Sequence, residues 1–146
     1  MSSWIPPKSP YDLLQERYWP NDWKILVVCL MLNQTSRKQV EPMIDDFFAK
    51  WPTAFDASIA DEGEMIKTIR SLGMYNKRVK TIKNMSKQYL NGFENAKDLY
   101  GCGKYADDTY RIFVKGEWKE VEPKDHALVF YHDFLNNIQG LDSKNA

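Results

Sequence analysis

The chain has 146 residues, of which 43% are apolar and 27% are charged, and its seven prolines and seven glycines form no biased tract. This composition is ordinary for a globular domain with a real core, and it excludes low-complexity and fibrous classes. The formal net charge of zero argues against a uniformly basic nucleic-acid binder. We expect one domain over 1–146, ordered from about 6 to about 140, with a disordered tail from Ser143.

Two cysteines, Cys29 and Cys102, are too few for a disulfide scaffold or for a four-cysteine iron–sulfur cluster. The sequence therefore favours a reducing compartment and no bound cluster. The longest apolar run, 25–32, is far shorter than a membrane span. The first ten residues are polar and proline-rich, which is not typical of a signal peptide.

Apolar residues at helical spacing predict an all-α fold of about nine helices, with no strand pair. Ser9-Pro10 resembles a cap that opens a short helix through Gln15, and Asn21 precedes a very apolar helix over 23–33, which we expect at the centre. A third helix is predicted to start at Thr35 or Ser36, and further helices to cover 54–60, 61–72, 75–90 and 95–100. Another helix runs from a glycine turn at 101–103 to about Gly116, and the last runs from Lys124 or Asp125 to Ile138.

One segment is basic although the whole chain has no net charge, because residues 65–93 include lysines and arginines but no acid. One face of the predicted helix 75–90 could therefore attract phosphates, although a plain solvated helix surface is an equal alternative for each side chain. The basic residues of the segment are Lys67, Arg70, Lys77, Arg78, Lys80, Lys83 and Lys87.

A glycine turn leads directly into the next predicted helix. Gly101 and Gly103 flank Cys102, and glycine allows a positive φ or a close backbone approach. A turn that opens a helix directs free backbone N–H groups to one point, which suits an anion such as a phosphate. The chain then turns at Pro123 and reaches Asp125, which alone would fit a helix N-cap.

Leu99, Gly101, Gly103, Asp125 and His126 together resemble the helix-hairpin-helix DNA glycosylase superfamily. Other segments, such as Leu32-Asn-Gln-Thr-Ser, Leu72-Gly-Met-Tyr and the stretch from Gly103 to Phe113, are similar to the catalytic domain of the methyl-CpG-binding-domain mismatch glycosylases. The resemblance covers about 6–135, and it implies a cluster-free helix-hairpin-helix glycosylase fold.

The resemblance implies that Asp125 is the catalytic carboxylate. Cleavage of an N-glycosidic bond builds positive charge on the sugar, which a carboxylate can stabilise while it orients water. Tyr105 stands where bifunctional relatives have a Schiff-base lysine, and a phenol cannot form that adduct. We therefore expect a monofunctional enzyme in which Tyr105 also lines the base pocket and Gln15 reads the pyrimidine edge. Core packing of Tyr105 and a surface position for Gln15 are the structural alternatives.

The resemblance also implies a DNA-binding set. Gln34 and Met74 match two wedge positions, which fill the hole left by a flipped nucleotide and press on its partner base. The hairpin and the basic helix add Gly101, Gly103, Lys104, Lys77, Arg78 and Lys80. Asp108 matches a further family position, or simply favours a helix start. Gln34, Met74 and Ala127 depart from the nearest family pattern, where arginine, leucine and lysine are found.

The expected function is excision of a flipped uracil or thymine, opposite guanine, from double-stranded DNA during base excision repair. One alternative is a non-catalytic helix-hairpin-helix module that only grips DNA. Another is an enzyme acting on a modified pyrimidine in hypermodified DNA. We expect a monomer with no metal site and no organic cofactor, although the resemblance allows a monovalent cation at the hairpin carbonyls. An intracellular location follows, nuclear in a eukaryote and otherwise cytoplasmic.

Overall fold

The structure is a computed structural model that describes residues 3–145. All regular structure within these residues is helical, which confirms the all-α prediction. The α-helices are α1 (Leu14–Tyr18), α2 (Asp22–Leu32), α3 (Arg37–Lys50), α4 (Ala54–Ser58), α5 (Glu62–Ile69), α6 (Tyr75–Asn91), α7 (Lys104–Tyr110) and α8 (His126–Asn145). Short 3-10 segments lie at Arg70–Leu72, Ala96–Asp98 and Trp118–Glu120, and a π-helical turn at Arg111–Lys115 extends α7.

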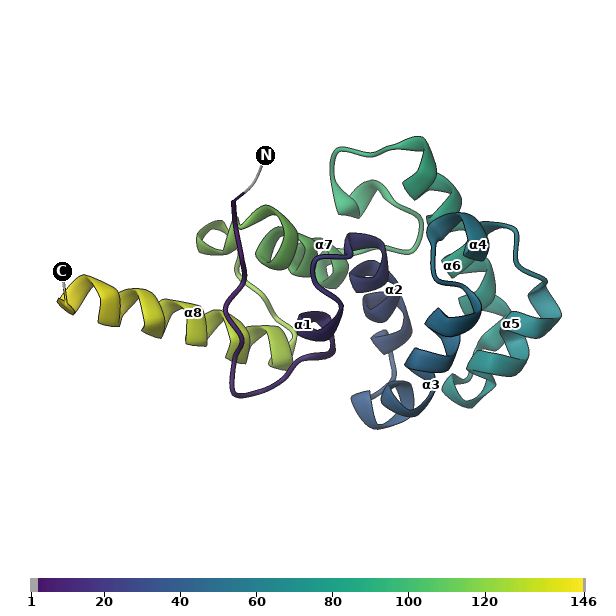
Figure 1. The fold of residues 1–146 in the computed structure, drawn as a ribbon, viewed down its shortest axis with the longest axis horizontal. Helices are drawn as coiled ribbons and strands as arrows, with labels where there is room; N and C mark the ends of the chain where they lie inside the picture. Colours follow the sequence, from purple (N-terminus) through teal and green to yellow (C-terminus); the bar gives the residue numbers. More distant parts are fainter. Residues whose placement is uncertain (1–2, 146) are drawn as a thin grey trace.

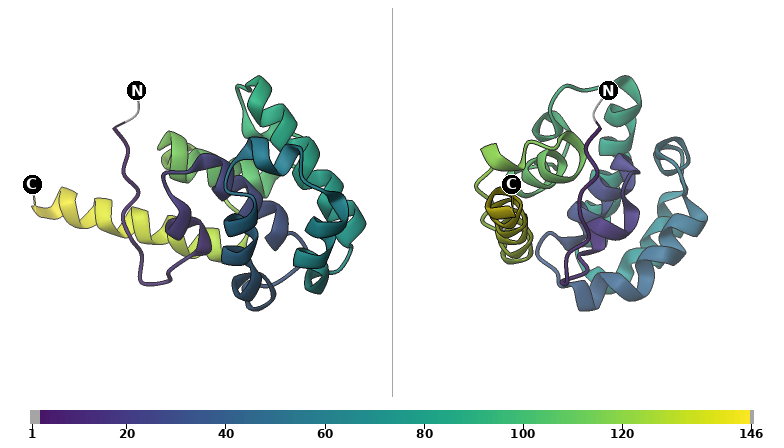
Figure 2. Two further views of the ribbon diagram at one scale, coloured as in Figure 1. Left: turned by 45° about the vertical axis from the view of Figure 1, so that its right-hand side comes forward. Right: turned by 60° about the vertical axis from the view of Figure 1, so that its left-hand side comes forward.

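Helix α2 lies at the centre, as its composition predicts. Its residues from Ile25 to Met31 are all buried, because the helix is apolar on every side. Helices α3, α4, α5 and α6 lie on one side of α2, and α7, α8 and the N-terminal segment lie on the other (Figure 1). The two rotated views in Figure 2 show the same division.

Side-chain caps fix most of the helix starts. Asn21 accepts a hydrogen bond from the Lys24 N–H, Ser36 forms a capping box with Gln39, and Thr53 and Asp61 cap α4 and α5. The predicted cap at Ser9 is wrong, because α1 begins only at Leu14. Instead the Glu16 carboxylate accepts hydrogen bonds from the Ser9 N–H, the Ser9 hydroxyl and the Leu13 N–H, each at 2.7 Å, and this organises the preceding loop.

The helical hairpin is shorter in its first arm than the sequence predicts. Only Ala96–Asp98 forms a 3-10 turn where the sequence predicts a helix over 95–100. This 3-10 turn is followed by Leu99, whose carbonyl accepts a hydrogen bond from the Cys102 N–H across the glycine turn. The second arm follows the prediction, since α7 and its π-helical extension end at Gly116, which has a left-handed backbone.

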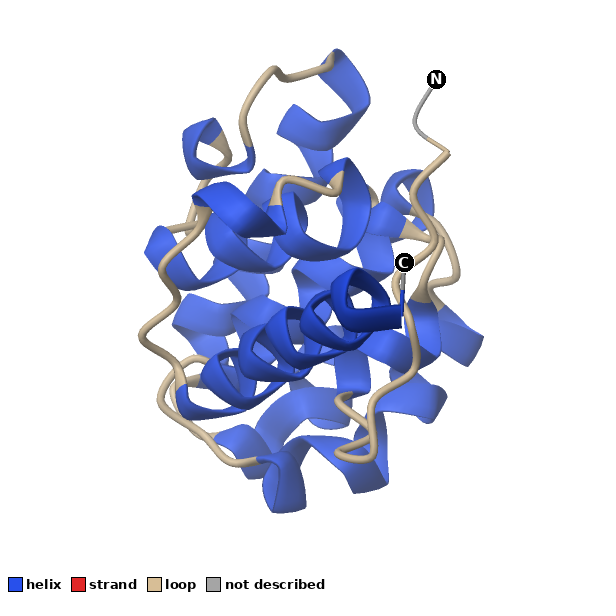
Figure 3. Ribbon diagram, turned by 90° about the vertical axis from the view of Figure 1, so that its left-hand side faces the viewer, coloured by secondary structure: helices blue, strands red, loops and turns tan. Residues whose placement is uncertain are grey.

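Helix α8 starts where Asp125 caps it and extends away from the rest of the molecule (Figure 1), so that it points toward the viewer in Figure 3. Its base is held by the N-terminal segment, because the Tyr131 hydroxyl donates a 2.6 Å hydrogen bond to the Pro7 carbonyl. The backbone remains helical to Asn145, which differs from the disordered tail expected from Ser143. No proline interrupts 126–145, and Gly140 is accommodated inside the helix.

Two clusters of buried side chains make up the core of the described residues. The larger is centred on α2, α3 and α6, and the smaller joins Leu13 and Ile25 to the π-helical turn, to Trp118 and Val121, and to α8. Tyr18, Tyr105 and Val114 pack against both clusters. The boundary between the clusters therefore passes beside Tyr105 and the start of α8, which is where the candidate site lies.

Candidate active site

A cavity of about 310 Å³ lies at this boundary and brings together the residues that the sequence singled out. Gln15 comes from α1, Tyr105 from α7, and Asp125 from the turn before α8, so three distant segments of the chain meet in it. The remaining lining residues are Tyr11, Leu13, Leu14, Leu32, Thr35, Arg37, His126, Ala127 and Phe130.

Gln15 and Tyr105 form a polar pair in the cavity wall. Gln15 is only 2% exposed, and its Nε2 donates a 2.6 Å hydrogen bond to the Tyr105 hydroxyl. Burial, together with the nearby Cys29 and Asp125, raises the pKa of the Tyr105 phenol far above its usual value. Burial likewise raises the pKa of the Cys29 thiol to about 12. Both groups are therefore neutral at physiological pH, so neither supplies an anionic nucleophile.

Asp125 acts as a cap and also faces the cavity. Its Oδ2 accepts a 3.2 Å hydrogen bond from the Leu128 N–H, and its carbonyl accepts one from the Val129 N–H. No hydrogen bond within residues 3–145 engages its other carboxylate oxygen. Asp125 is therefore a helix N-cap, as the structural alternative predicts. One oxygen of its half-buried carboxylate nevertheless remains available to a ligand.

The mouth of the cavity contains side chains that sequence reasoning missed. Tyr11 and Phe130 stack with ring centroids 5.5 Å apart, although each ring is about half exposed. Arg37 binds the Asp12 carbonyl and also forms ion pairs with Asp12 and Glu41, which ties the loop before α1 to α3. No local sequence signal marks these residues, because the N-terminal loop meets α3 and α8 only in the folded chain.

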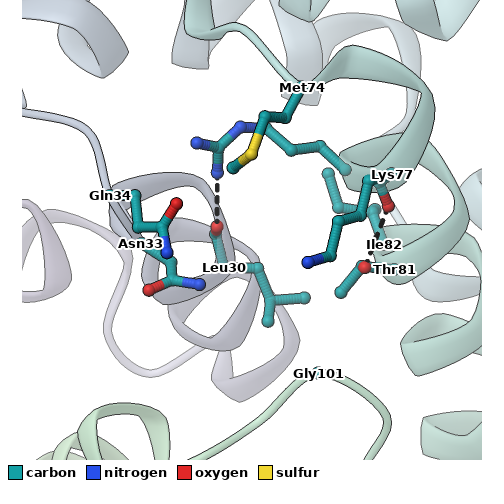
Figure 4. A pocket seen from close by; sticks show the side chains of 9 residues that line it. Leu30, Asn33, Gln34, Met74, Lys77, Thr81, Ile82 and Gly101 are labelled. Atoms are coloured by element: carbon teal, nitrogen blue, oxygen red, sulfur yellow. Dashed lines mark hydrogen bonds between the residues drawn. The ribbon is translucent and has the colours of Figure 1, made fainter.

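A second cavity, of about 220 Å³, is lined by both predicted wedge residues, and Lys77 and Thr81 lie across it from Gln34 (Figure 4). Gln34 follows α2, Met74 precedes α6, and both are exposed. Both also have positive φ angles, 61° for Gln34 and 44° for Met74, which non-glycine residues rarely adopt. Lys77 from α6 and Gly101 from the hairpin also line it, so several of the predicted DNA-facing residues lie here, whereas Gly103, Lys104 and Lys80 do not line this cavity.

The position expected for Arg78 on the exposed basic face is wrong. Arg78 is 6% exposed, and its guanidinium donates hydrogen bonds to the Gly73 carbonyl at 2.9 Å and the Leu30 carbonyl at 3.3 Å. Figure 4 marks the bond to Leu30. No carboxylate of the described residues pairs with it, and burial lowers its pKa. It joins the end of α2 to the turn before Met74, whereas Lys77 and Lys80 are exposed.

The two hairpin glycines have different roles. Gly101 has a φ of 77°, and a β-carbon there would lie 2.3 Å from the Thr81 Cγ2, so both its conformation and its space require glycine. A β-carbon on Gly103 would meet nothing within 4 Å. Gly103 precedes α7, whose N-terminus has no side-chain cap, so these N–H groups remain open to an external anion.

Metal-ligating side chains are scattered over residues 3–145. No three His, Cys, Asp or Glu side chains in that range gather closely enough to hold a metal ion. No helix among the same residues combines the length and apolarity needed to cross a membrane.

A known protein family and several known proteins are similar to most of this chain. The family model of the HhH-GPD superfamily base excision DNA repair proteins matches residues 27–139. A methyl-CpG-binding domain protein 4-like protein from Arabidopsis thaliana is 42% identical over 92% of the chain, which corresponds to 30% of that relative. A thymine/uracil-DNA glycosylase from Methanothermobacter thermautotrophicus is 28% identical over 86% of the chain and 61% of its own length.

The fold has a solved counterpart. The structure of a thermostable thymine-DNA glycosylase superposes with a TM-score of 0.64 at 23% identity, and the match covers 75% of this chain and 52% of that one. The chain thus spans less than two thirds of the length of each relative described here.

Proposed function

Since this chain belongs to the HhH-GPD superfamily of base excision DNA repair proteins, we propose that it is a DNA glycosylase that removes a flipped uracil or thymine from double-stranded DNA. The observation that carries the proposal is the convergence of Gln15, Tyr105 and Asp125 on one cavity. Its volume, about 310 Å³, is in the range of small-ligand sites, and its wall offers few but well-placed polar groups.

Each of the three side chains has a separate role in the proposed reaction. The Gln15 carboxamide carries both a donor and an acceptor, which suits the edge of uracil or thymine, and Tyr105 holds that carboxamide in place. Asp125 faces the sugar, where its carboxylate stabilises the positive charge that develops as the bond to the base breaks. The same carboxylate orients the water that adds to the sugar and accepts its proton.

The second cavity supports a role for Gln34 and Met74 in base extrusion. Extrusion of a nucleotide costs a few kcal/mol, and a side chain inserted into the stack offsets part of that cost. In our proposal one of the two fills the vacated space and the other presses on the unpaired base, which is guanine in a G·U or G·T pair. Both residues hold backbone conformations that non-glycine residues rarely adopt, and such strain often marks functional positions.

We propose a monofunctional mechanism, because the cavity has no lysine at position 105 or elsewhere in its lining. Wild-type enzyme is expected to leave an intact abasic site, with no strand break and no covalent adduct trapped by borohydride. Tyr105→Lys introduces an amine where the phenol lies and is expected to produce some trapped adduct. Trapping of the wild-type protein on DNA would contradict this part of the proposal.

A modified pyrimidine is a second candidate substrate, and one lining residue favours it. Ala127 lines the cavity, and its one-carbon side chain leaves room beside the base for a substituent. Excision of uracil, thymine and 5-hydroxymethyluracil opposite guanine, compared in otherwise identical duplexes, tests both candidates. The uracil and thymine proposal requires release of one of these bases at a rate at least equal to that of the modified base.

Lys77 and Lys80 are expected to contact phosphates, since both are exposed on α6. Replacing both by methionine should make the dependence of affinity on salt less steep, by up to about 0.9 logarithmic unit for each phosphate that is no longer neutralised. The measurement is a binding titration at several salt concentrations. An unchanged slope would assign both lysines to a solvated surface.

Gly103→Val tests whether the hairpin holds a phosphate. The added β-carbon meets no protein atom within 4 Å, so we expect the free energy of unfolding to change little apart from backbone restriction. DNA affinity is nevertheless expected to fall about equally for all sequences, since the side chain would occupy the space in front of the α7 N-terminus. A folded variant with wild-type affinity would show that no phosphate approaches there. The hairpin carbonyls remain our proposed position for any monovalent cation.

A further inference from the structure

Lys104 is not simply an exposed cation beside the hairpin. Its ammonium lies 2.7 Å from the Asp108 Oδ2 and 3.0 Å from the Glu122 carbonyl oxygen, and it donates to both. The Asp108 side chain is only 8% exposed, whereas that of Lys104 is 51% exposed. Lys104 thus bridges the buried face of α7 and the segment that crosses toward α8.

That segment carries Asp125, three residues beyond Glu122. It is fastened at its start by Arg111, which pairs with Glu117 at 3.0 Å and Glu120 at 3.3 Å, and Trp118 and Val121 are buried. Between Val121 and the Asp125 cap, the bond from Lys104 to the Glu122 carbonyl is the only hydrogen bond to α7 within the described residues. Tyr105 is the next residue of the same helix, so this hydrogen bond joins the helix that carries Tyr105 to the segment that carries Asp125.

The pairing also opposes release of Lys104 to DNA. Removal of the ammonium would leave the Asp108 carboxylate buried without its cation, which is strongly unfavourable. Two of the three ammonium N–H groups are engaged in these bonds, so only the third remains to meet a phosphate without breaking them.

We propose that Lys104, held by Asp108, is a positioning residue that fixes the Asp125 segment against α7, rather than a phosphate contact. The inference rests on the proposed function only in giving Asp125 its role in excision. The hydrogen bonds of Lys104 are present in the folded chain whether or not Asp125 is catalytic.

Lys104→Met is the direct test. At saturating enzyme, single-turnover excision from a G·U duplex is expected to fall by roughly 10- to 100-fold, because small displacements of a catalytic group are costly. Affinity and its salt dependence, measured on a duplex with non-hydrolysable 2′-fluoro-deoxyuridine, should remain at wild-type values. Asp108→Leu, which removes the acceptor of the Lys104 hydrogen bond, should slow excision in the same way, and the double variant should be little worse than either single variant.

Amide hydrogen exchange supplies a readout that needs no activity. Lys104→Met should speed exchange of the N–H groups in 121–129 without affecting α2 or α3. Lys104→Arg, which can still donate to both oxygens, should restore slow exchange and excision. Lys119→Met, an exposed lysine in the same segment, is the matched control and should resemble wild type.

Two results would overturn the proposal. Weaker binding with a flatter salt dependence and a wild-type saturating rate would make Lys104 a phosphate contact. Unchanged exchange and excision would make the bridge irrelevant. If Lys104→Met fails to fold, Asp108→Leu, which breaks the bridge, and Lys104→Arg, which keeps it, carry the same comparison. A wild-type protein that excises nothing would instead count against the proposed function, while the exchange measurement still decides the tie.

Discussion

Replacement of Asp125 by asparagine is expected to lower the rate of base excision by roughly 10²–10⁴, the usual range for a positioned acid–base group. The amide keeps the shape of the carboxylate but cannot stabilise a developing sugar cation or accept a proton from water. Single-turnover excision from a G·U or G·T duplex measures this effect without interference from slow product release.

The same variant should fold and bind DNA normally. Asparagine caps helices about as well as aspartate, so its side-chain oxygen can still accept the Leu128 N–H and preserve the start of α8. DNA affinity should be equal or tighter, since a negative charge near the phosphates is removed. Asp133→Asn removes the same charge from an exposed position on α8 and is the matched control. A folded Asp125→Asn protein that excises at the wild-type rate would refute the catalytic role.

Gln15→Leu is expected to have the second largest effect, a loss of about 10- to 100-fold in kcat/KM for a uracil substrate. The side chain is almost fully buried, so leucine fits the available volume but offers the base neither donor nor acceptor. The Tyr105 hydroxyl also loses its 2.6 Å partner, and polar groups of the bound base remain unpaired.

Binding to an abasic-site analogue provides the control for this variant. No base enters the cavity in that complex, so Gln15→Leu should bind it as tightly as wild type does. Equal losses for the analogue and for the uracil duplex would show that Gln15 supports the fold and does not read the base. A thermal melting curve for each protein separates the two interpretations further.

Local sequence features predict the parts of the fold that depend on neighbouring residues. Asn21, Ser36 and Gly116 mark helix ends by capping and left-handed geometry, and those ends lie where the sequence predicts them. The all-apolar α2 had to be buried on every side. The convergence of Gln15, Tyr105 and Asp125 follows only from the family resemblance, because no spacing rule connects positions so far apart.

The failures lie where tertiary contacts decide the outcome. Arg78 follows the basic pattern of α6, yet it turns inward because two carbonyls at Gly73 and Leu30 need a donor. Helix α1 starts later than predicted because Glu16 organises the loop before it. The ties made by Lys104 and Arg37 join segments that are distant in sequence, so composition and periodicity could not reveal them.

Release of free base from a G·U duplex by the wild-type protein is the most direct test of the proposed glycosylase activity. The protein in excess is mixed with duplexes containing G·U, G·T or a normal G·C pair, and the products are analysed for free base and, after alkali, for strand cleavage. We expect free uracil or thymine and an abasic site cleaved only by alkali, with no release from G·C. Tight binding to all three duplexes without release of any base would contradict the proposal and would leave a module that only grips DNA.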